Sequence, residues 1–428
     1  MHKSLNYSAI RFTVGFLAVL FGLVSCTREP MSVRMVRSEM QRCPSAAELD
    51  GMAGRLKWNY TTGLELLAML DAADSFVADA PRNDSSVDAL CNDTPCHSEP
   101  AEQVKESDSI LQYAEAWYDA IIREDGSVGA NYKRGNYNVD HICPARTLFK
   151  LYDLTGKEKY RAAIDSIYTQ VKTQPRTETG NFWHKKIYPH QVWLDGLYMA
   201  QPFYAMYAAR FLGDDDKLQA FNDIALQFRT AYNKCYDPAT GLLRHAWDES
   251  KSMFWADPVT GQSAHSWGRA MGWYMMALID VLDYFPEDYP ARQDLLDILA
   301  TLLDVLQQFA DPATGMWYQV LDCPGREGNY IESTCSAMFT YVYLKAVDKG
   351  YASQYAKYSR MLYKKLVKAF VHDNGDGTIT LTQCCAVAGL GGKKNRSGDY
   401  DYYIHEKITE NDPKGVGPFI WASLIYEK

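Results

Sequence analysis

Residues 266–309 read SWGRAMGWYMMALIDVLDYFPEDYPARQDLLDILATLLDVLQQF and contain two different helical patterns in succession. The first, from Ser266 to Tyr284, is rich in small and aromatic residues, which is typical of a helix crowded among other helices. The second, from Pro290 onward, repeats leucine at helical spacing with charges between, as expected for a helix with one face in water. The stretch therefore predicts a pair of helices, one inner and one outer.

The same pairing recurs along the chain. The expected pairs are 58–72 with 108–123, 141–154 with 158–173, 192–212 with 216–233, 266–284 with 290–309, and 333–348 with 353–371, and a sixth begins at Phe419. Similar turn sequences, such as DPATG at both 237–241 and 311–315, connect the helices. Repeated irregular pairs indicate a closed double ring. We therefore expect an all-α fold, an (α/α)6 barrel of six inner and six outer helices, with a pocket where the inner helices end.

The composition narrows the class of function. The chain has 428 residues, of which 47% are hydrophobic, so it can bury a large core. Its net charge of −9 makes nucleic acid an unexpected partner. The 30 Tyr, 16 Phe and 10 Trp exceed what a core needs and are typical of sugar-binding clefts, so a small oligosaccharide is the expected ligand.

The sequence carries no motif for a cofactor or a metal. It lacks a P-loop, a glycine-rich dinucleotide motif after a strand, a nucleophile elbow and a His-Glu-x-x-His motif. The ten cysteines show no two close couples of the zinc-binding kind. The run from Asp373 to Gly377 resembles a calcium loop but lacks its spaced glutamate, so we interpret it as a turn.

The N-terminus has the pattern of an export signal. Lys3 and Arg11 precede an apolar run, Phe12 to Val24, which is shorter than the roughly 20 residues that span a membrane. The run ends in Leu-Val-Ser-Cys26, which is similar to a bacterial lipobox. We expect a lipoprotein signal peptide over residues 1–25, lipidation of Cys26, a flexible tether over 26–44, and one domain over 45–428 with an insertion near 80–106. The alternative is a plain secreted protein whose cleavage site contains a cysteine.

This reading places the protein in the bacterial cell envelope, on the periplasmic or the outer side. Its contact with the membrane would be through the lipid at Cys26 alone, and we expect a monomer. Cys91 and Cys96 are the only plausible local disulfide, whereas Cys384 and Cys385 are expected in the core.

The densest group of candidate site residues lies in 181–203, NFWHKKIYPHQVWLDGLYMAQPF. It places His184, Lys185, Trp193 and Asp195 at the mouth of the third inner helix. Asp195 lies among aromatic residues, and a partly dehydrated cleft raises a carboxyl pKa so that the group can hold a proton near neutral pH. The alternative is an N-cap or first-turn aspartate that satisfies free backbone amides.

A second group lies in 265–273, HSWGRAMGW, at the start of the fourth inner helix, and includes Trp267. Arg269 and Trp273 are four residues apart and share a helical face, so a guanidinium would lie beside an indole that stacks on a sugar. The alternative is a core tryptophan pair with the arginine tied to a structural carboxylate. His245 is a further candidate donor, although a lone histidine is more often simply hydrogen-bonded. Asp140, before the second inner helix, is the other well-placed carboxylate.

These strings resemble glycoside hydrolase family 105, the unsaturated rhamnogalacturonyl hydrolases, from about Trp58 to Lys428. The resemblance rests on YPHQVWLDGLYMAQPF, SWGRAMGWYMMAL, NVDHICPARTLFKLYDLTGKEKY and the C-terminal YDYYIHEKITENDPKGVGPFIWASLIYE. It implies an (α/α)6 barrel that removes a 4,5-unsaturated galacturonyl residue from short fragments left by pectin lyases. Related family 88 enzymes act on unsaturated glucuronyl ends, which is the alternative substrate.

The resemblance also implies roles for individual residues. Asp195 matches the general acid/base and Asp140 a binding or orienting carboxylate. The residues matched to substrate binding are His184, Lys185, Trp193, Trp267, Arg269, Trp273 and, less securely because its loop varies, His245. The insertion near 80–106 departs from compact family members.

The expected chemistry needs only one acid, because the C4=C5 bond of an unsaturated uronide is a vinyl ether that a single carboxyl can protonate. Two other functions fit the residues. One is a two-carboxylate glycosidase on saturated glycans, with Asp140 and Asp195 as the pair. The other is a surface-tethered protein that binds glycans without cleaving them.

Overall fold

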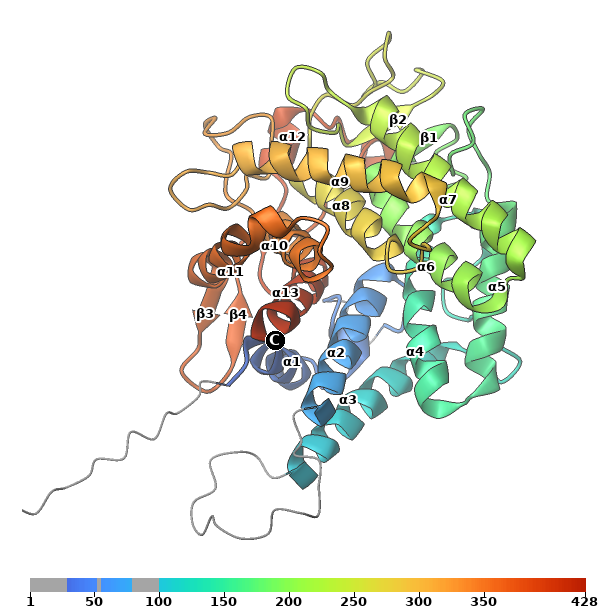
Figure 1. The fold of residues 1–428 in the computed structure, drawn as a ribbon, viewed down its shortest axis with the longest axis vertical. Helices are drawn as coiled ribbons and strands as arrows, with labels where there is room; N and C mark the ends of the chain where they lie inside the picture. Colours follow the sequence, from blue (N-terminus) through green and yellow to red (C-terminus); the bar gives the residue numbers. More distant parts are fainter. Residues whose placement is uncertain (1–28, 52–54, 79–99) are drawn as a thin grey trace, which may run out of the picture.

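The computed structural model describes residues 29–51, 55–78 and 100–428, and it shows the double ring of helices (Figure 1). Each inner helix packs against the next, with the 3-10 turns before α4 completing its contacts, and the last packs against the first, which closes the ring. The inner helices are α2 (Tyr60–Ala78), α4 (Arg146–Thr155), α6 (Leu194–Phe211), α8 (Gly268–Val281), α10 (Ser333–Asp348) and α13 (Pro413–Glu427).

Five outer helices each follow the inner helix that they cover. They are α3 (Pro100–Ile121), α5 (Glu158–Thr173), α7 (Asp214–Cys235), α9 (Pro290–Gln308) and α11 (Ala356–Phe370). The sixth cover comes from the other end of the chain, because α1 (Met31–Arg42) packs against α13. The expected (α/α)6 architecture is confirmed.

Helix α1 shows that the expected tether is wrong over residues 31–42. It buries Val33, Met35 and Val36. Its polar residues have distant partners: Ser32 Oγ donates to Glu427 Oε2 at 2.5 Å, and Arg34 pairs with Asp373 at 3.0 Å. These contacts hold the segment on the barrel, so it is part of the domain. The expected signal peptide and Cys26 lie outside the described residues.

Other boundaries also differ from the expected ones. Helix α13 begins at Pro413, ahead of Phe419, because Asp412 caps it by accepting from the Lys414 amide at 3.0 Å. Part of the expected insertion, residues 100–106, belongs to α3. Its remainder, residues 80–99 with Cys91 and Cys96, lies outside the described part of the chain.

Short strands and turns complete the fold between the helices. Three antiparallel ladders pair β1 (Gln191–Trp193) with β2 (Ala246–Asp248), β3 (Val371–Asp373) with β4 (Ile379–Leu381), and β5 (Cys384–Cys385) with β6 (Ile408–Thr409). The short helices are η1 (Ala46–Glu48), η2 (Arg134–Asn136), η3 (Val139–His141), η4 (Cys143–Ala145), η5 (Ser353–Tyr355), η6 (Gly392–Lys394) and α12 (Tyr400–Ile404). The run from Asp373 to Gly377 lies in the β3–β4 hairpin and is a turn, as expected.

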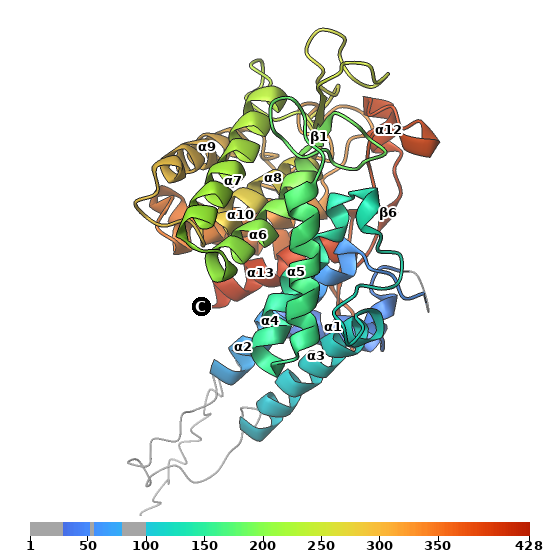
Figure 2. The ribbon, with the colours of Figure 1, turned by 90° about the vertical axis from the view of Figure 1, so that its right-hand side faces the viewer.

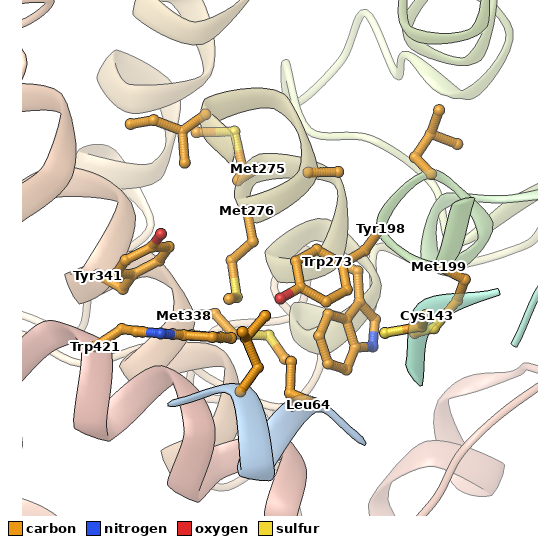
Figure 3. Packing of buried hydrophobic residues seen from close by; sticks show 14 of the residues in the cluster. Leu64, Cys143, Tyr198, Met199, Trp273, Met275, Met276, Met338, Tyr341 and Trp421 are labelled. Carbon is orange, nitrogen blue, oxygen red and sulfur yellow. The ribbon is translucent and has the colours of Figure 1, made fainter. Parts of the chain in front are cut away.

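The space inside the inner ring is filled by methionine and aromatic side chains (Figure 3). Every residue of α8 is buried, which explains its lack of a polar face. A Cβ at Gly272 would lie 2.5 Å from the sulfur of Met338, so this glycine allows α8 and α10 to approach closely. Cys384 and Cys385 are buried, as expected. Among the described residues, no helix is both long and apolar enough to cross a membrane.

Candidate active site

The starts of four inner helices meet at one end of the barrel, where β1, α12 and long loops gather (Figure 2). Tyr60 begins α2, Asp140 lies in the η3 turn ahead of α4, and Asp195 and Arg269 lie in the first turns of α6 and α8. Burial raises the pKa of Tyr60 well above its usual value, Asp140 and Asp195 raise it further, and Arg269 opposes them. The four side chains therefore share one local electric field. Helix N-termini carry partial positive charge, so this end of the barrel suits an anionic ligand.

Asp195 has no role as a helix cap. Trp193 is the N-cap of α6, and no side chain caps the helix there. The Oδ2 atom of Asp195 lies 3.2 Å from His245 Nε2, and its side chain is 15% exposed. At the start of α10, by contrast, Glu332 accepts from the Cys335 amide at 2.7 Å. The N-cap interpretation of Asp195 is therefore wrong, and its carboxylate is not committed to the backbone.

His245 is fully buried and has a neighbour at each ring nitrogen. Its Nδ1 lies 2.7 Å from the hydroxyl of Tyr403, in α12, and its Nε2 faces Asp195. The Tyr403 hydroxyl and Nδ1 are within hydrogen-bond distance, and the tautomer of the ring decides which of them donates. The ladder of β1 and β2 sets this geometry, because it ends with Trp193 paired to Ala246, two residues before Asp195 and one residue after His245.

Asp140 is held in an ion pair. Its Oδ2 lies 2.6 Å from Lys185 Nζ, and its Oδ1 lies 3.4 Å from His184 Nε2. Burial works to raise the pKa of Asp140, but Lys185 and His184 outweigh it and lower the pKa to about 2. Asp140 is therefore ionised at neutral pH.

His184 is buried and lies against Trp193, with ring centroids 4.6 Å apart. Burial lowers the pKa of His184 to about 4, with Lys185 adding to the effect and Asp140 opposing it, so the ring is neutral near pH 7. Trp193 also stacks on Tyr188 at 5.3 Å and is 5% exposed. The indole of Trp193 thus supports the site from behind its histidine.

Of the three site residues expected at the fourth inner helix, the structure keeps Trp267 and Arg269 together and places Trp273 elsewhere. The guanidinium of Arg269 lies 5.0 Å from the ring centre of Trp267, and Arg269 donates to the carbonyl of Cys385. Trp273 is fully buried and packs on Tyr198 at 4.7 Å, inside the barrel (Figure 3). It also meets the ring of Tyr60, 6.1 Å away. Trp273 therefore supports the floor of the site, and the expected stacking of Trp273 on a sugar does not fit its burial.

Sequence reasoning missed Tyr60 and Tyr403. Tyr60 begins α2 and Tyr403 lies within α12, and the site residues near each of them come from distant parts of the sequence. No local spacing of residues therefore marks either tyrosine as part of a site. A further group, His265, Asp322 and Cys323, lies beside the site, with its three ligand-type atoms within 4.8 Å of one another. Asp322 also accepts from Arg244 at 2.8 Å, so a guanidinium already balances its charge.

Comparisons with known proteins agree with this arrangement. The family model described as Glycosyl Hydrolase Family 88 matches residues 99–428. A family 105 glycoside hydrolase from C. acetobutylicum ATCC 824 superposes with a TM-score of 0.81 at 38% identity, covering 93% of this chain and 99% of that one. The chain belongs to the family 88 and family 105 glycoside hydrolases.

More distant relatives of this glycoside hydrolase share the fold or part of the sequence. A possible family 105 member from Salmonella enterica has a TM-score of 0.65 at 23% identity, covering 86% of this chain and 82% of that one. The 24.9 kDa protein in the picA locus of Rhizobium radiobacter is 37% identical over 211 residues, which is 48% of this chain and 89% of that protein. In this glycoside hydrolase, the polar cluster at the helix N-termini is the candidate active site.

Proposed function

We propose that this glycoside hydrolase removes a 4,5-unsaturated uronic acid, of the galacturonyl type, from the non-reducing end of short pectin fragments. These fragments would be rhamnogalacturonan oligosaccharides made by lyases. The observation that carries the proposal is the difference between the two carboxylates. Asp140 is neutralised by Lys185 at 2.6 Å, whereas Asp195 caps no helix and, among the described residues, has the imidazole of His245 as its ion-pair partner.

One carboxyl group is enough for the hydration of a vinyl ether. Protonated Asp195 donates its proton to C4 of the sugar, and positive charge develops at C5, where the ring oxygen stabilises it. Water adds at C5 and returns a proton to the Asp195 carboxylate, so the enzyme is regenerated. The resulting hemiketal opens and expels the remaining sugar. In this route His245 positions Asp195, because its Nε2 lies 3.2 Å from Asp195 Oδ2 and its Nδ1 lies 2.7 Å from the Tyr403 hydroxyl.

The substrate's own carboxylate needs a cation, although the whole chain is acidic. Lys185, with 22% of its side chain exposed, is a cation that solvent reaches at the site. Arg269 is 1% exposed, so its charge acts mainly through the local potential. Together with the N-termini of the inner helices, these two cations favour a uronate over a neutral sugar.

The two-carboxylate alternative requires Asp140 or Asp195 to act as acid while the other acts as base. A carboxyl with a pKa of about 2 holds almost no proton at neutral pH, so Asp140 cannot be the acid. It could act only as the base, yet it is bound to Lys185. The geometry therefore favours the single-acid route on an unsaturated substrate.

The test is a panel of lyase-generated unsaturated oligosaccharides, assayed by loss of the ultraviolet absorbance of the C4=C5 bond. We expect the highest kcat/KM with an unsaturated galacturonyl residue on rhamnose, and lower values with unsaturated glucuronyl ends. Cleavage of a saturated uronide at a comparable rate would overturn the proposal. Undiminished turnover by Asp195→Asn would remove Asp195 from the acid role.

We also propose that the protein is anchored to the cell envelope through a lipid at Cys26. The proposal is supported by the apolar run that ends in the lipobox-like Leu-Val-Ser-Cys26. Incorporation of labelled fatty acid into the wild type but not into Cys26→Ser is the expected result. Equal labelling of both chains would contradict it.

A further inference from the structure

A small cavity lies behind the ring of His184. His184, Trp193, Gly196, Gln201 and Gln227 are among the residues that line it. Its volume is about 10 Å³, which is close to the space that one water molecule occupies. The cavity adjoins the first turns of α6, since Gly196 directly follows Asp195.

Two hydrogen-bond acceptors belong to side chains that line this cavity. Nδ1 of His184 and Oε1 of Gln201 are buried and have no hydrogen-bond partner among the described residues. Both side chains are more than nine-tenths buried, at 3% and 1% exposure. A Cβ built at Gly196 would lie 3.1 Å from Nδ1, which places that nitrogen on the side of the ring that faces the cavity lining. Leaving a buried acceptor unpaired is costly, so these two atoms require a donor.

The tautomer of His184 follows from its other nitrogen. Nε2 lies 3.4 Å from the ionised carboxylate of Asp140, and a carboxylate accepts hydrogen bonds only. A neutral ring with its proton on Nε2 presents a lone pair at Nδ1. The opposite tautomer would direct a lone pair at the negative charge of Asp140, which is unfavourable.

We propose that one buried water molecule bridges Nδ1 of His184 and Oε1 of Gln201, and that Gln201 thereby acts as a positioning residue for the catalytic site. A water molecule has two protons, and here it donates one to each acceptor. The bridge holds the proton of His184 on Nε2, directed at Asp140. The effect on turnover rests on the proposed function, because it assumes that His184 and Asp140 orient the sugar beside Asp195.

Gln227 provides a matched control, because it lines the same cavity but has protein partners. Its Oε1 accepts from the Phe182 amide and its Nε2 donates to the Gly180 carbonyl, both at 2.9 Å. Replacing either glutamine by methionine keeps the side-chain volume approximately. Only Gln201→Met removes an acceptor from the bridge.

The first measurement needs no activity. In a crystal structure of the wild type we expect density for one water molecule within hydrogen-bond distance of His184 Nδ1 and of the Gln201 amide. In histidine-labelled protein, the nitrogen resonances of His184, assigned with His184→Gln, should report a proton on Nε2 and a hydrogen-bonded acceptor at Nδ1. In Gln201→Met the Nδ1 resonance should move to the position of an unbonded acceptor, and in Gln227→Met it should stay.

The second measurement is kinetic. We expect kcat on an unsaturated oligosaccharide to fall on the order of 10-fold in Gln201→Met, with a smaller change in KM. The reason is that the variant loses the orientation of His184 and Asp140 but keeps the surface that contacts the substrate. Gln227→Met should lower the Tm without this loss of kcat. A protein group bonded to Nδ1, or an unchanged Nδ1 resonance in Gln201→Met, would overturn the inference. Absence of any turnover by the wild type would refute the proposed function alone, since the water and the resonances are measured separately.

Discussion

Two carboxylates on neighbouring inner helices, Asp280 and Asp195, have opposite surroundings in the barrel. Asp280, near the C-terminal end of α8, lies 3.0 Å from Arg146 and 2.8 Å from Lys345, and accepts from the Tyr341 hydroxyl at 2.7 Å. Burial is outweighed by Lys345 and Arg146, which lower the pKa of Asp280. Asp195, in the first turn of α6, meets one imidazole.

The comparison shows how one fold separates structural from reactive acids. A carboxylate between two cations is stable as an anion and holds three helices together, since Arg146, Asp280 and Lys345 come from α4, α8 and α10. A carboxylate without a cationic partner can exchange a proton with a substrate. The following predictions test this separation, beginning with the largest expected effect.

Removing the carboxylate of Asp195, which has no cationic partner, should destroy activity and leave the fold intact. We expect Asp195→Asn to lower kcat on the order of 10²–10⁴-fold, the usual contribution of a general acid. Its Tm should remain near that of the wild type, because Asp195 caps no helix. Kinetics with an unsaturated oligosaccharide and thermal unfolding test both parts, and a large loss of Tm would show that Asp195 is structural.

Removing the carboxylate of Asp280, which lies between two cations, should instead destabilise the fold. Asp280→Asn leaves Arg146 buried without its anion and leaves Lys345 to its second partner, Asp283, which should cost about 3–5 kcal/mol of unfolding free energy. Denaturant unfolding measures this loss. Asp283→Asn, at 28% exposure the outer partner of Lys345, is the control and should cost less than about 1 kcal/mol. An equal loss in both variants would contradict the comparison.

The neutral His184 should make the fold sensitive to acid. Its pKa is lowered to about 4 when folded, against about 6.5 when unfolded. The unfolded chain binds the proton first, so stability contributed by neutral His184 is present above pH 6.5 and is lost as the pH falls toward 4. The expected loss is about 3 kcal/mol. In His184→Gln, the slope of unfolding free energy against pH between these values should be smaller; an unchanged slope would assign it to other groups.

The smallest effect concerns Tyr60, whose hydroxyl lies in the field of both site carboxylates. We expect Tyr60→Phe to lower kcat/KM by roughly 2–10-fold, as the loss of one hydrogen bond to substrate predicts. Its Tm should change little, because the ring keeps its contact with Trp273. Steady-state kinetics measures the effect, and a loss as large as that of Asp195→Asn would place Tyr60 in the proton transfer itself.

Most of the barrel could be predicted from the sequence, because each inner and outer pair carries its own helical periodicity. Helix α1 could not. Its segment, MSVRMVRSEMQR, is polar on average. Arg34 is buried with a partner that is distant in sequence, Asp373 in β3, whereas Glu39 pairs with Arg42 of the same helix. The pattern of a segment reports its local amphipathicity and not the distant groups that neutralise its charges.

The site was predictable where spacing and identity coincide, as in Asp195, His184 and Lys185. It was not predictable where the role of a residue depends on the direction in which its helical face points. The spacing of Arg269 and Trp273 gives a shared face, but it does not say whether that face meets the pocket or the barrel axis. The structure places the Trp273 indole in the core, beside Tyr198.

The closure of the ring by α1 and α13 sets an order on folding. These helices lie at opposite ends of the described chain, so α1, made first, lacks its partner α13 until the last helix is made. At roughly 5–20 residues per second this delay lasts on the order of tens of seconds. During that time the side of α1 that packs against α13 stays uncovered, so the domain is complete only when its C-terminal helix has been made.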